Sequence, residues 1–201
     1  MPKRKYELRK RAEKQAETRR RIVRAVSDLH RTVGPAHTTV SAVAERAGVR
    51  RLTVYRHFPN EEALVAACGA DWEERHPMPD PARWVPIEDP AQRAKAALVD
   101  LYNYYDETAD MFEKILRDAP LVPAFGPVMV ELREYYDAAR DVLLEPWGLE
   151  GDDLSRAAAL IGMALEFNTW QSLARQGLDP AEAARLMATL VESTAARRTG
   201  Q

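Results

Sequence analysis

The sequence predicts an all-α protein, with a small N-terminal helical part and a C-terminal helical bundle. Ala, Leu, Glu and Arg dominate its 201 residues, and the apolar/polar alternation that marks strands is hard to find. Apolar residues instead recur at helical spacing, and prolines and glycines mark most of the breaks between these stretches. Hydrophobic content is 46% with 7% aromatic residues, which fits a globular helical chain. No stretch is a convincing strand.

The first firm helix is predicted to begin at Thr18 or Arg19 and to end before Gly34. Apolar residues at helical spacing form a stripe along it, from Ile22 to Val33. His30 lies in this helix, where a partly buried, hydrogen-bonded histidine is a simpler interpretation than a ligand or a catalyst. Residues 1–18 contain seven lysines and arginines and few apolar anchors, so we expect a basic arm that is loose or frayed-helical.

Two short helices follow, within residues 39–58. Val40, Val43, Ala44 and Ala47 form one apolar stripe. Thr39 precedes this stripe as a helix cap, and Gly48 follows it as a left-handed residue that ends the helix. A second helix, roughly residues 50–57, starts after a two-residue break. Two short helices joined by a Gly-containing turn form a helix-turn-helix outline.

The second of these helices has an unusual surface. Val49, Val54 and Phe58 can share a core, which leaves the remaining positions to the outside. These positions are Arg50, Arg51, Thr53, Tyr55, Arg56 and His57. A solvated structural helix normally mixes charges of both signs, but this one has three arginines and no acid. Because arginine binds guanine edges and hydroxyl groups bind phosphates, the pattern indicates an interface for double-stranded DNA.

The string AVAERAGVRRLTVYRHFPNEEAL resembles the DNA-binding region of the tetracycline-repressor (TetR) family of bacterial regulators, from Arg19 to about Leu64. The resemblance implies contacts to backbone and base edges for Thr39 and Ser41. It implies entry into the major groove for Arg50, Arg51, Leu52 and Tyr55, and phosphate contacts for Thr53, Arg56 and His57.

This sequence departs from the family pattern at two positions. Leu52 stands where Gly, Ala or Pro is common, so a branched apolar side chain is directed toward the groove and can read thymine methyl groups. Glu61 stands where a phosphate-binding Lys is common. The basic arm is a candidate replacement, following phosphates or reaching a minor groove. An arm that is only a solvated extension remains the alternative.

The predicted domain organisation has three parts. Residues 1–18 are the basic arm, 19–60 the helix-turn-helix domain, and 61–201 a helical ligand-binding and dimerisation domain. A helix over 61–75 begins after a capping Asn60, and five prolines make 76–90 an extended loop. Helices are then expected at 90–107, 109–118, 127–144, 152–176 and 180–194. Asp152 and Asp179 are expected to cap the last two, with Gly177 ending the helix before Asp179.

Residues 157–170, AAALIGMALEFNTW, are apolar around most of a helix and should be buried on more than one side. Together with the apolar positions of residues 183–191 they offer surface for a homodimer. In the resembled family the last two long helices form such an interface. Closure of the monomer's own core is the alternative.

Aromatic and Met residues concentrate in the C-terminal part, where the resemblance implies a chamber for a small-molecule effector. Candidate lining residues are Trp72, Tyr102, Tyr105, Phe112, Met129, Tyr136, Met163, Glu166, Phe167 and Trp170. Ligand pockets are mostly apolar with a few placed polar groups, which Glu166 can supply here. For any single aromatic residue, a place in the core remains the simpler interpretation.

Charge is distributed unevenly along the chain. The net charge is −2, yet residues 1–59 contain 16 Lys and Arg against 5 Asp and Glu, whereas the remainder contains 13 against 26. A polyanion is therefore attracted by one end and repelled by the other. One cysteine, Cys68, excludes an internal disulfide and fits the cytoplasm. No apolar stretch is long enough for a bilayer, and no signal peptide is expected.

Enzyme classes find little support. The four histidines form no H-E-x-x-H pair, and the sequence has no G-x-G-x-x-G, P-loop or G-x-S-x-G motif. No catalytic residue, metal or cofactor is expected. The sequence thus predicts a DNA-binding transcriptional regulator, a repressor released from a palindromic operator by a small molecule. The alternative is an architectural or effector-independent helical DNA-binding protein.

Overall fold

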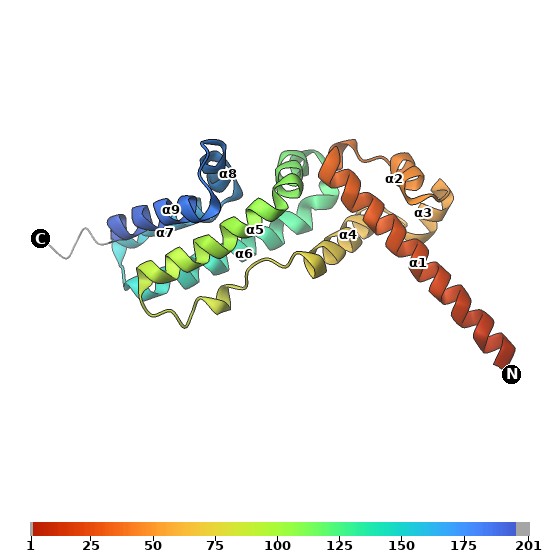
Figure 1. The fold of residues 1–201 in the computed structure, drawn as a ribbon, viewed down its shortest axis with the longest axis horizontal. Helices are drawn as coiled ribbons and strands as arrows, with labels where there is room; N and C mark the ends of the chain where they lie inside the picture. The colour runs from red at the N-terminus through yellow and green to blue at the C-terminus, as the bar shows by residue number, and fades with distance from the viewer. Residues whose placement is uncertain (1, 196–201) are drawn as a thin grey trace, which may run out of the picture. The chain divides into compact units, whose positions relative to one another are not determined.

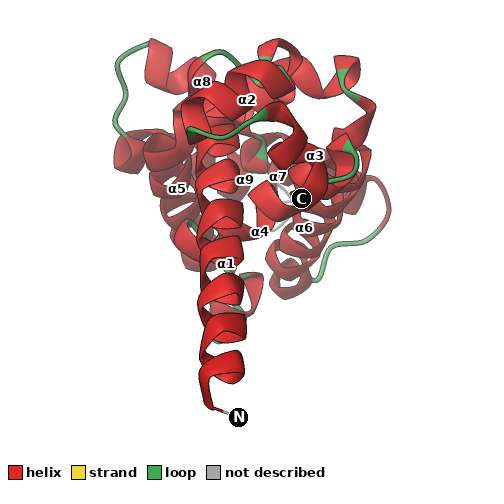
Figure 2. Ribbon diagram, turned by 90° about the vertical axis from the view of Figure 1, so that its right-hand side faces the viewer, coloured by secondary structure: helices red, strands yellow, loops and turns green. Residues whose placement is uncertain are grey.

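A computed structural model describes residues 2–195; Met1 and residues 196–201, at the ends of the predicted arm and C-terminal domain, lie outside the described residues. Helices and loops make up the described chain, with no strand between residues 2 and 195 (Figure 2). The prediction of an all-α fold is confirmed. None of these helices is both long enough and apolar enough to cross a membrane.

The chain forms two compact units. Unit 1 contains the residues up to Arg75 and Asp110–Met129, and unit 2 contains His76–Ala109 and the residues from Val130 onward. The chain passes from one unit to the other at residues 75–76 and within two long helices. The predicted domain boundaries at residues 18/19 and 60/61 remain predictions.

Unit 1 is built from four helices and the ends of two more (Figure 1). The helices are α1 (Pro2–Thr32), α2 (Val40–Ala47), α3 (Arg51–His57), α4 (Glu61–Arg75), the last turns of α5 (Pro90–Asp118) and the first turn of α6 (Gly126–Leu144). Three short 3₁₀ turns lie at η1 (Pro35–His37), η3 (Ala119–Leu121) and η4 (Pro123–Phe125). The segment expected to be a loose arm is the first half of α1.

Apolar side chains from α1, α2, α3 and α4 meet in one core. Ile22 and Val26 of α1 are fully buried against Val43 of α2 and Val54 of α3. Phe58, just after α3, is also buried there, as predicted from the sequence. This packing fixes how α3 is held against α1 and leaves the opposite side of α3 in solvent.

Unit 2 contains the first part of α5, most of α6, and the three C-terminal helices. These are α7 (Gly151–Leu165), α8 (Phe167–Arg175) and α9 (Pro180–Ala195), with 3₁₀ turns at η2 (Pro81–Arg83) and η5 (Glu145–Trp147). α9 contacts both α7 and α8. Asp179 caps α9 by accepting from the Glu182 N–H at 2.8 Å, and Gly177 has φ +90°, as predicted for both residues.

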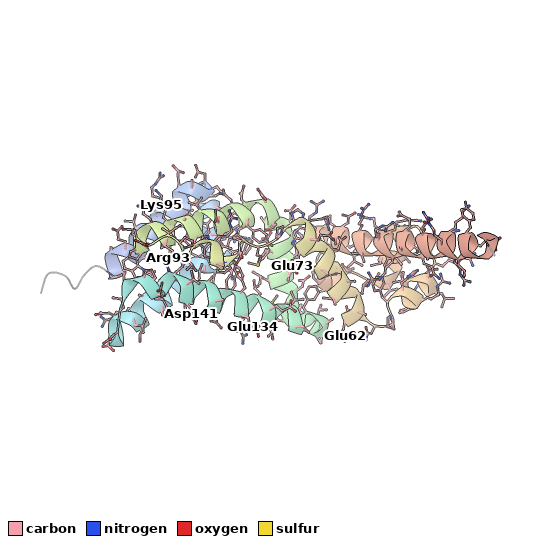
Figure 3. All side chains as sticks on the ribbon, turned by 90° about the horizontal axis from the view of Figure 1, so that it is seen from below. Glu62, Glu73, Arg93, Lys95, Glu134 and Asp141 are labelled. Atoms are coloured by element: carbon pink, nitrogen blue, oxygen red, sulfur yellow. The ribbon has the colours of Figure 1, made fainter. Side chains whose placement is uncertain are left out.

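The proline-rich segment before α5 is held against the rest of unit 2 by polar contacts. Trp84 is buried and its Nε1–H donates to Asp100 at 3.0 Å. The guanidinium of Arg93, labelled in Figure 3, donates to the carbonyl oxygens of Val85 at 2.8 Å and Ile87 at 2.7 Å. The Tyr135 hydroxyl donates to the carbonyl of Pro79. The segment is therefore extended, but it is fastened in place.

The predicted break at Thr108 is wrong, because α5 runs through it without interruption. Thr108 is buried and its hydroxyl donates to the Tyr104 carbonyl of the same helix at 2.6 Å. This local bond satisfies the side chain inside a helix, so the weak helix propensity of threonine is overridden.

The predicted continuous helix over 152–176 is also wrong. The chain breaks at Glu166, whose φ of −72° and ψ of 140° are extended, and this residue separates α7 from α8. Asp152 is not a cap either, since α7 starts at Gly151 after Glu150. At the break, tyrosine hydroxyls from α5 donate to the Ala164 and Leu165 carbonyls, which a continuous helix would pair internally.

Candidate functional site

Two signals in the local sequence determine where helix α2 begins and ends. The Thr39 hydroxyl accepts from the Ala42 N–H at 3.2 Å, and Gly48 takes left-handed angles, φ 63° and ψ 40°. Arg21 of α1 adds a tertiary contact, because its guanidinium donates to the carbonyl oxygens of Ala47 and, at 3.2 Å, Gly48. These hydrogen bonds attach the turn between α2 and α3 to α1.

Helix α3 begins one residue later than predicted, with Arg50 as its extended N-cap. Val54 and Phe58 face the core, and the Arg19 guanidinium lies 4.7 Å from the centre of the Phe58 ring. This cation–π contact links α1 to the end of α3. The inner side of α3 is therefore packed, and its orientation in unit 1 follows from that packing.

The outer side of α3 is cationic and apolar at once. Leu52 is 81% exposed and Tyr55 is 47% exposed. Arg50, Arg51 and Arg56 are exposed as well, and none of them has an ion-pair partner within residues 2–195. Large apolar side chains and unpaired guanidinium groups on one short helix have no role in the fold of unit 1. They are available to a partner.

Thr53 and His57 are half-buried at the edge of this surface. The His57 Nε2 atom is buried and has no hydrogen-bond partner in the part of the chain that the structure describes. Desolvation, with Arg56 and Arg19 nearby, lowers the pKa of His57. The ring is therefore neutral near pH 7 and can offer a phosphate an N–H group but little charge.

The other predicted positions around α3 are exposed. Thr39 and Ser41 lie at the start of α2. Glu61 lies in the first turn of α4, after Asn60 accepts from the Ala63 N–H at 2.9 Å. A carboxylate there stabilises the helix terminus and repels phosphate, so the missing anchor at this position stays a prediction.

The first half of α1 provides further positive charge. Its residues 6–17 are exposed, and side chains project from several sides of the helix (Figure 3). Arg9 pairs with Glu13 at 2.8 Å, whereas Lys10, Arg11 and Lys14 make no ion pair with described residues. The cationic surface of α3 is thus accompanied by a second cationic segment of unit 1.

The predicted ligand residues fall into two groups. Trp72, Phe112 and Met129 belong to unit 1, and each is half-buried. The other seven belong to unit 2. Four of these form one aromatic cluster with ring centres 5.3–6.3 Å apart: Tyr102, Tyr105, Phe167 and Trp170. Tyr136 joins the cluster through its hydroxyl, which lies 2.8 Å from that of Tyr105.

The aromatic cluster is shielded from solvent in this structure. Tyr102, Tyr105 and Phe167 are at most 1% exposed, whereas Met163 is 46% exposed and Glu166 also faces solvent. Burial raises the pKa of Tyr136 to about 12, and it raises the pKa values of Tyr102 and Tyr105 as well. These hydroxyls are protonated donors near neutral pH. Their contacts favour a core role for the individual rings.

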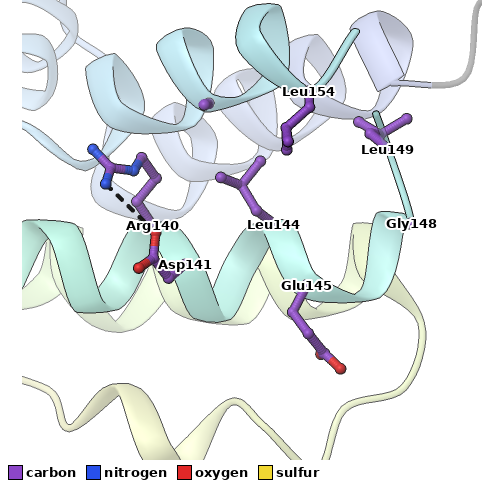
Figure 4. A pocket seen from close by; sticks show the side chains of 8 residues that line it. Arg140, Asp141, Leu144, Glu145, Gly148, Leu149 and Leu154 are labelled. Carbon is purple, nitrogen blue, oxygen red and sulfur yellow. Dashed lines mark hydrogen bonds and ion pairs between the residues drawn. The ribbon is translucent and has the colours of Figure 1, made fainter. Parts of the chain in front are cut away.

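An open surface pocket that the sequence did not indicate lies between α6 and α7 (Figure 4). Its volume is about 480 Å³, and Leu144 and Leu154 point toward one another across it. Arg140 and Asp141 form an ion pair of 3.4 Å at one side. None of the ten predicted ligand residues lines it. Packing of two separate helices creates this space, so no local pattern in the sequence marks it.

Residues 22–68 match the family described as bacterial regulatory proteins, tetR family. The HTH-type transcriptional regulator TtgR of Pseudomonas putida is 38% identical over 69 residues, which is 34% of this chain and 33% of that protein. The match therefore spans about a third of the length of this curated relative.

Solved structures resemble the chain over a greater length. A TetR-like transcriptional regulator from Rhodococcus sp. RHA1 has a TM-score of 0.63 at 19% identity, covering 90% of this chain and 97% of that one. A TetR transcription regulator from Haloarcula marismortui ATCC 43049 has a TM-score of 0.59 at 20% identity, with the same two coverages. At these identities the likeness establishes the fold.

No group of three or more residues suited to hold a metal ion occurs between residues 2 and 195. The family match covers α2 and α3 and describes bacterial regulatory proteins, and the curated relative is a transcriptional regulator. Residues 22–68 therefore resemble the tetR family of bacterial regulatory proteins, and the chain has the fold of TetR-like regulators over most of its length.

Proposed function

We propose that the protein is a homodimeric, sequence-specific DNA-binding regulator of transcription, a repressor whose hold on a palindromic operator is released by a small-molecule effector. The outer surface of α3 carries this proposal. Leu52, Tyr55 and three arginines without ion-pair partners among the described residues stand in solvent there, on a helix whose inner side is locked into the core. Such a helix fits the major groove, where guanidinium groups bind guanine and apolar groups meet thymine methyls.

Roles can be assigned by position on this surface. Arg50, Arg51, Leu52 and Tyr55 are proposed to read base edges, together with Thr39 and Ser41 at the start of α2. Thr53, Arg56 and His57 at the edge of the surface are proposed to hold phosphates. The neutral ring of His57 makes it a positioning contact, whereas Arg56 supplies charge.

The homodimer is proposed from unit 2. Met163 on α7 and Leu186 and Leu190 on α9 are between 43% and 46% exposed, and α7 contacts α9. Three large apolar side chains in solvent on two adjoining helices form a surface that a second copy can cover. A two-fold dimer would present two α3 helices to half-sites about 34 Å apart.

The test is a comparison of operator and random DNA. An operator is first selected from random duplexes, and its affinity is then measured by fluorescence anisotropy at fixed salt. Arg51→Ala or Tyr55→Ala should weaken operator binding by about 1–3 kcal/mol and leave random duplexes nearly unaffected. Lys10→Ala in the arm should weaken both kinds of DNA alike and reduce the salt dependence.

Arg133→Ala, an exposed arginine on α6, is the matched control and should change neither affinity. Equal losses on operator and random DNA for Arg51→Ala would contradict base reading. They would instead favour the architectural alternative, which binds any duplex.

A further inference from the structure

The break between α7 and α8 is not imposed by the residues at the break. The sequence there is Ala164-Leu165-Glu166-Phe167-Asn168, without proline or glycine, and Ala, Leu and Glu are strong helix formers. Glu166 is exposed and its side chain does not cap α8. Local helix propensity therefore favours one continuous helix, so contacts from residues far along the chain must stabilise the break.

Three tyrosines of unit 2 provide that hold. The Tyr102 hydroxyl donates to the Ala164 carbonyl at 2.8 Å, and the Tyr105 hydroxyl donates to the Leu165 carbonyl at 2.6 Å. The oxygens of Tyr105 and Tyr136 are 2.8 Å apart, and the Phe167 N–H donates to the Tyr136 hydroxyl. Because each phenol has one proton, Tyr136 donates to Tyr105, and a chain of hydrogen bonds runs from Phe167 to Leu165.

These are the backbone groups that a continuous helix would pair internally. In such a helix the Asn168 N–H would donate to the Ala164 carbonyl and the Thr169 N–H to the Leu165 carbonyl. In the structure the Thr169 N–H donates to Glu166 at 3.1 Å instead, and both carbonyls accept from tyrosines. The two forms therefore satisfy these backbone carbonyls by alternative donors.

The broken form also leaves one group unsatisfied. Trp170 of α8 is 4% exposed, and its Nε1–H has no hydrogen-bond partner in the region that the structure describes. A buried donor without a partner opposes the conformation that buries it. The buried, unpaired Trp170 N–H thus destabilises the broken form, whereas the tyrosine hydrogen bonds stabilise it.

We propose that residues 164–168 are a conformational switch with a broken form, held by Tyr102, Tyr105 and Tyr136, and a continuous form in which α7 and α8 become one helix. Straightening the chain at Glu166 redirects α8 relative to α7. It also transfers three hydroxyl groups to other partners. The switch is a property of unit 2 and does not depend on DNA binding.

The backbone at Glu166 and the amide of Asn168 report the two forms directly. The ¹³Cα chemical shift of Glu166 distinguishes extended from helical backbone. The Asn168 amide lies in the first turn of α8 and donates to no backbone carbonyl within residues 2–195, so it exchanges with solvent in the broken form. In the continuous form the Ala164 carbonyl protects it.

The first test removes hydroxyls and keeps the rings. In the Tyr102→Phe/Tyr105→Phe variant, the Glu166 shift should move to helical values. Exchange at Asn168 should slow by about tenfold or more, the shift in equilibrium expected from one net hydrogen bond. Tyr135→Phe is the control, because that hydroxyl bonds the Pro79 carbonyl and should leave both signals unchanged.

The second test acts on Glu166 itself and leaves the buried cluster intact. Glu166→Ala favours the continuous helix and should protect the Asn168 amide, whereas Glu166→Ser supplies an N-cap for α8 and should leave it unprotected. If Glu166→Ala shows no added protection, or if a folded Tyr102→Phe/Tyr105→Phe protein keeps an extended Glu166, the switch does not exist. Packing of Phe167 and Trp170 alone would then fix the break.

Discussion

At the scale of single residues, a buried carboxylate fastens the turn that follows α1. The Asp118 side chain is 3% exposed, accepts from Arg117 at 2.6 Å, and accepts from the Ala36 N–H at 3.1 Å. The Arg117 hydrogen bond, helped by the Ala36 N–H, lowers the pKa of Asp118. Arg117 also donates to the Val33 carbonyl at 3.1 Å. The turn that leads into α2 therefore depends on the end of α5.

Gly34 is predicted to be required in this turn. Its φ is +96°, and a Cβ would lie 2.3 Å from both Arg117 Nη2 and Asp118 Oδ2. Gly34→Ala should lower the free energy of unfolding by about 2–4 kcal/mol, through backbone strain and loss of the buried bonds. Gly69→Ala, at an open helical site of α4, should raise it by about 0.5–1 kcal/mol. Urea denaturation measures both, and equal effects would refute the clash.

His30 is predicted to make stability depend on pH. Burial lowers its pKa from 6.5 to about 4, against the opposing pull of Asp118. Between pH 6.5 and 4 the unfolded chain takes up a proton that the folded ring does not. The contribution of His30 to the free energy of unfolding should therefore be fully present above pH 6.5, and this free energy should fall by about 2–3 kcal/mol toward pH 4.

His30→Phe should flatten this part of the pH profile, because phenylalanine keeps the ring contact with Phe125 and cannot be protonated. His37→Phe, at an exposed position, should keep the slope of the original protein. Denaturation curves at about pH 7, 5.5 and 4 provide the measurement. An unchanged slope in His30→Phe would assign the acid sensitivity to other groups.

At the scale of elements, Arg93 is predicted to hold the proline-rich segment on unit 2. Besides Val85 and Ile87 it donates to the Val142 carbonyl at 3.0 Å and to Glu145 at 2.8 Å, and its side chain is 5% exposed. Arg93→Ala leaves carbonyl groups without donors and should cost about 3–5 kcal/mol in thermal or urea unfolding.

The carboxylate partner of Arg93 should matter much less. The Glu145 side chain is 71% exposed, so Glu145→Ala should cost under about 1 kcal/mol. A comparable loss in both variants would show that the ion pair, rather than the carbonyl contacts, fastens the segment.

Elements with local signals were predictable from the sequence, and elements set by distant contacts were not. Thr39 and Asn60 cap helices with their own side chains, and Gly48 ends a helix because it adopts left-handed backbone angles. The helix ends beside these residues agree with the prediction. The outward position of the α3 arginines followed from helical periodicity alone. The break at Glu166 is accompanied by contacts from Tyr102 and other tyrosines that lie on α5 and α6, far along the chain, so no window around it reveals the break.

At the scale of the whole molecule, the homodimer is predicted to depend on α9. Leu186→Glu/Leu190→Glu places two carboxylates on the proposed apolar surface and should yield monomers in sedimentation velocity, with weaker binding to a palindromic operator. Val130→Glu makes the same exchange at a 52% exposed position of α6 and should leave the dimer intact. Dimers that survive the α9 changes would exclude this surface as the interface.

The uninterrupted course of α1 has a mechanical consequence. Its residues 2–18 extend about 25 Å beyond Arg19, since each helical residue rises about 1.5 Å. The cationic segment is thus a stiff lever whose pivot lies in the core around Ile22. Tilting the helix by about 10° at Ile22 would move its tip by roughly 5 Å at this rise per residue, more than the reach of one hydrogen bond. Small adjustments of side-chain packing around Ile22 would therefore be magnified into the gain or loss of contacts at the far end of the lever.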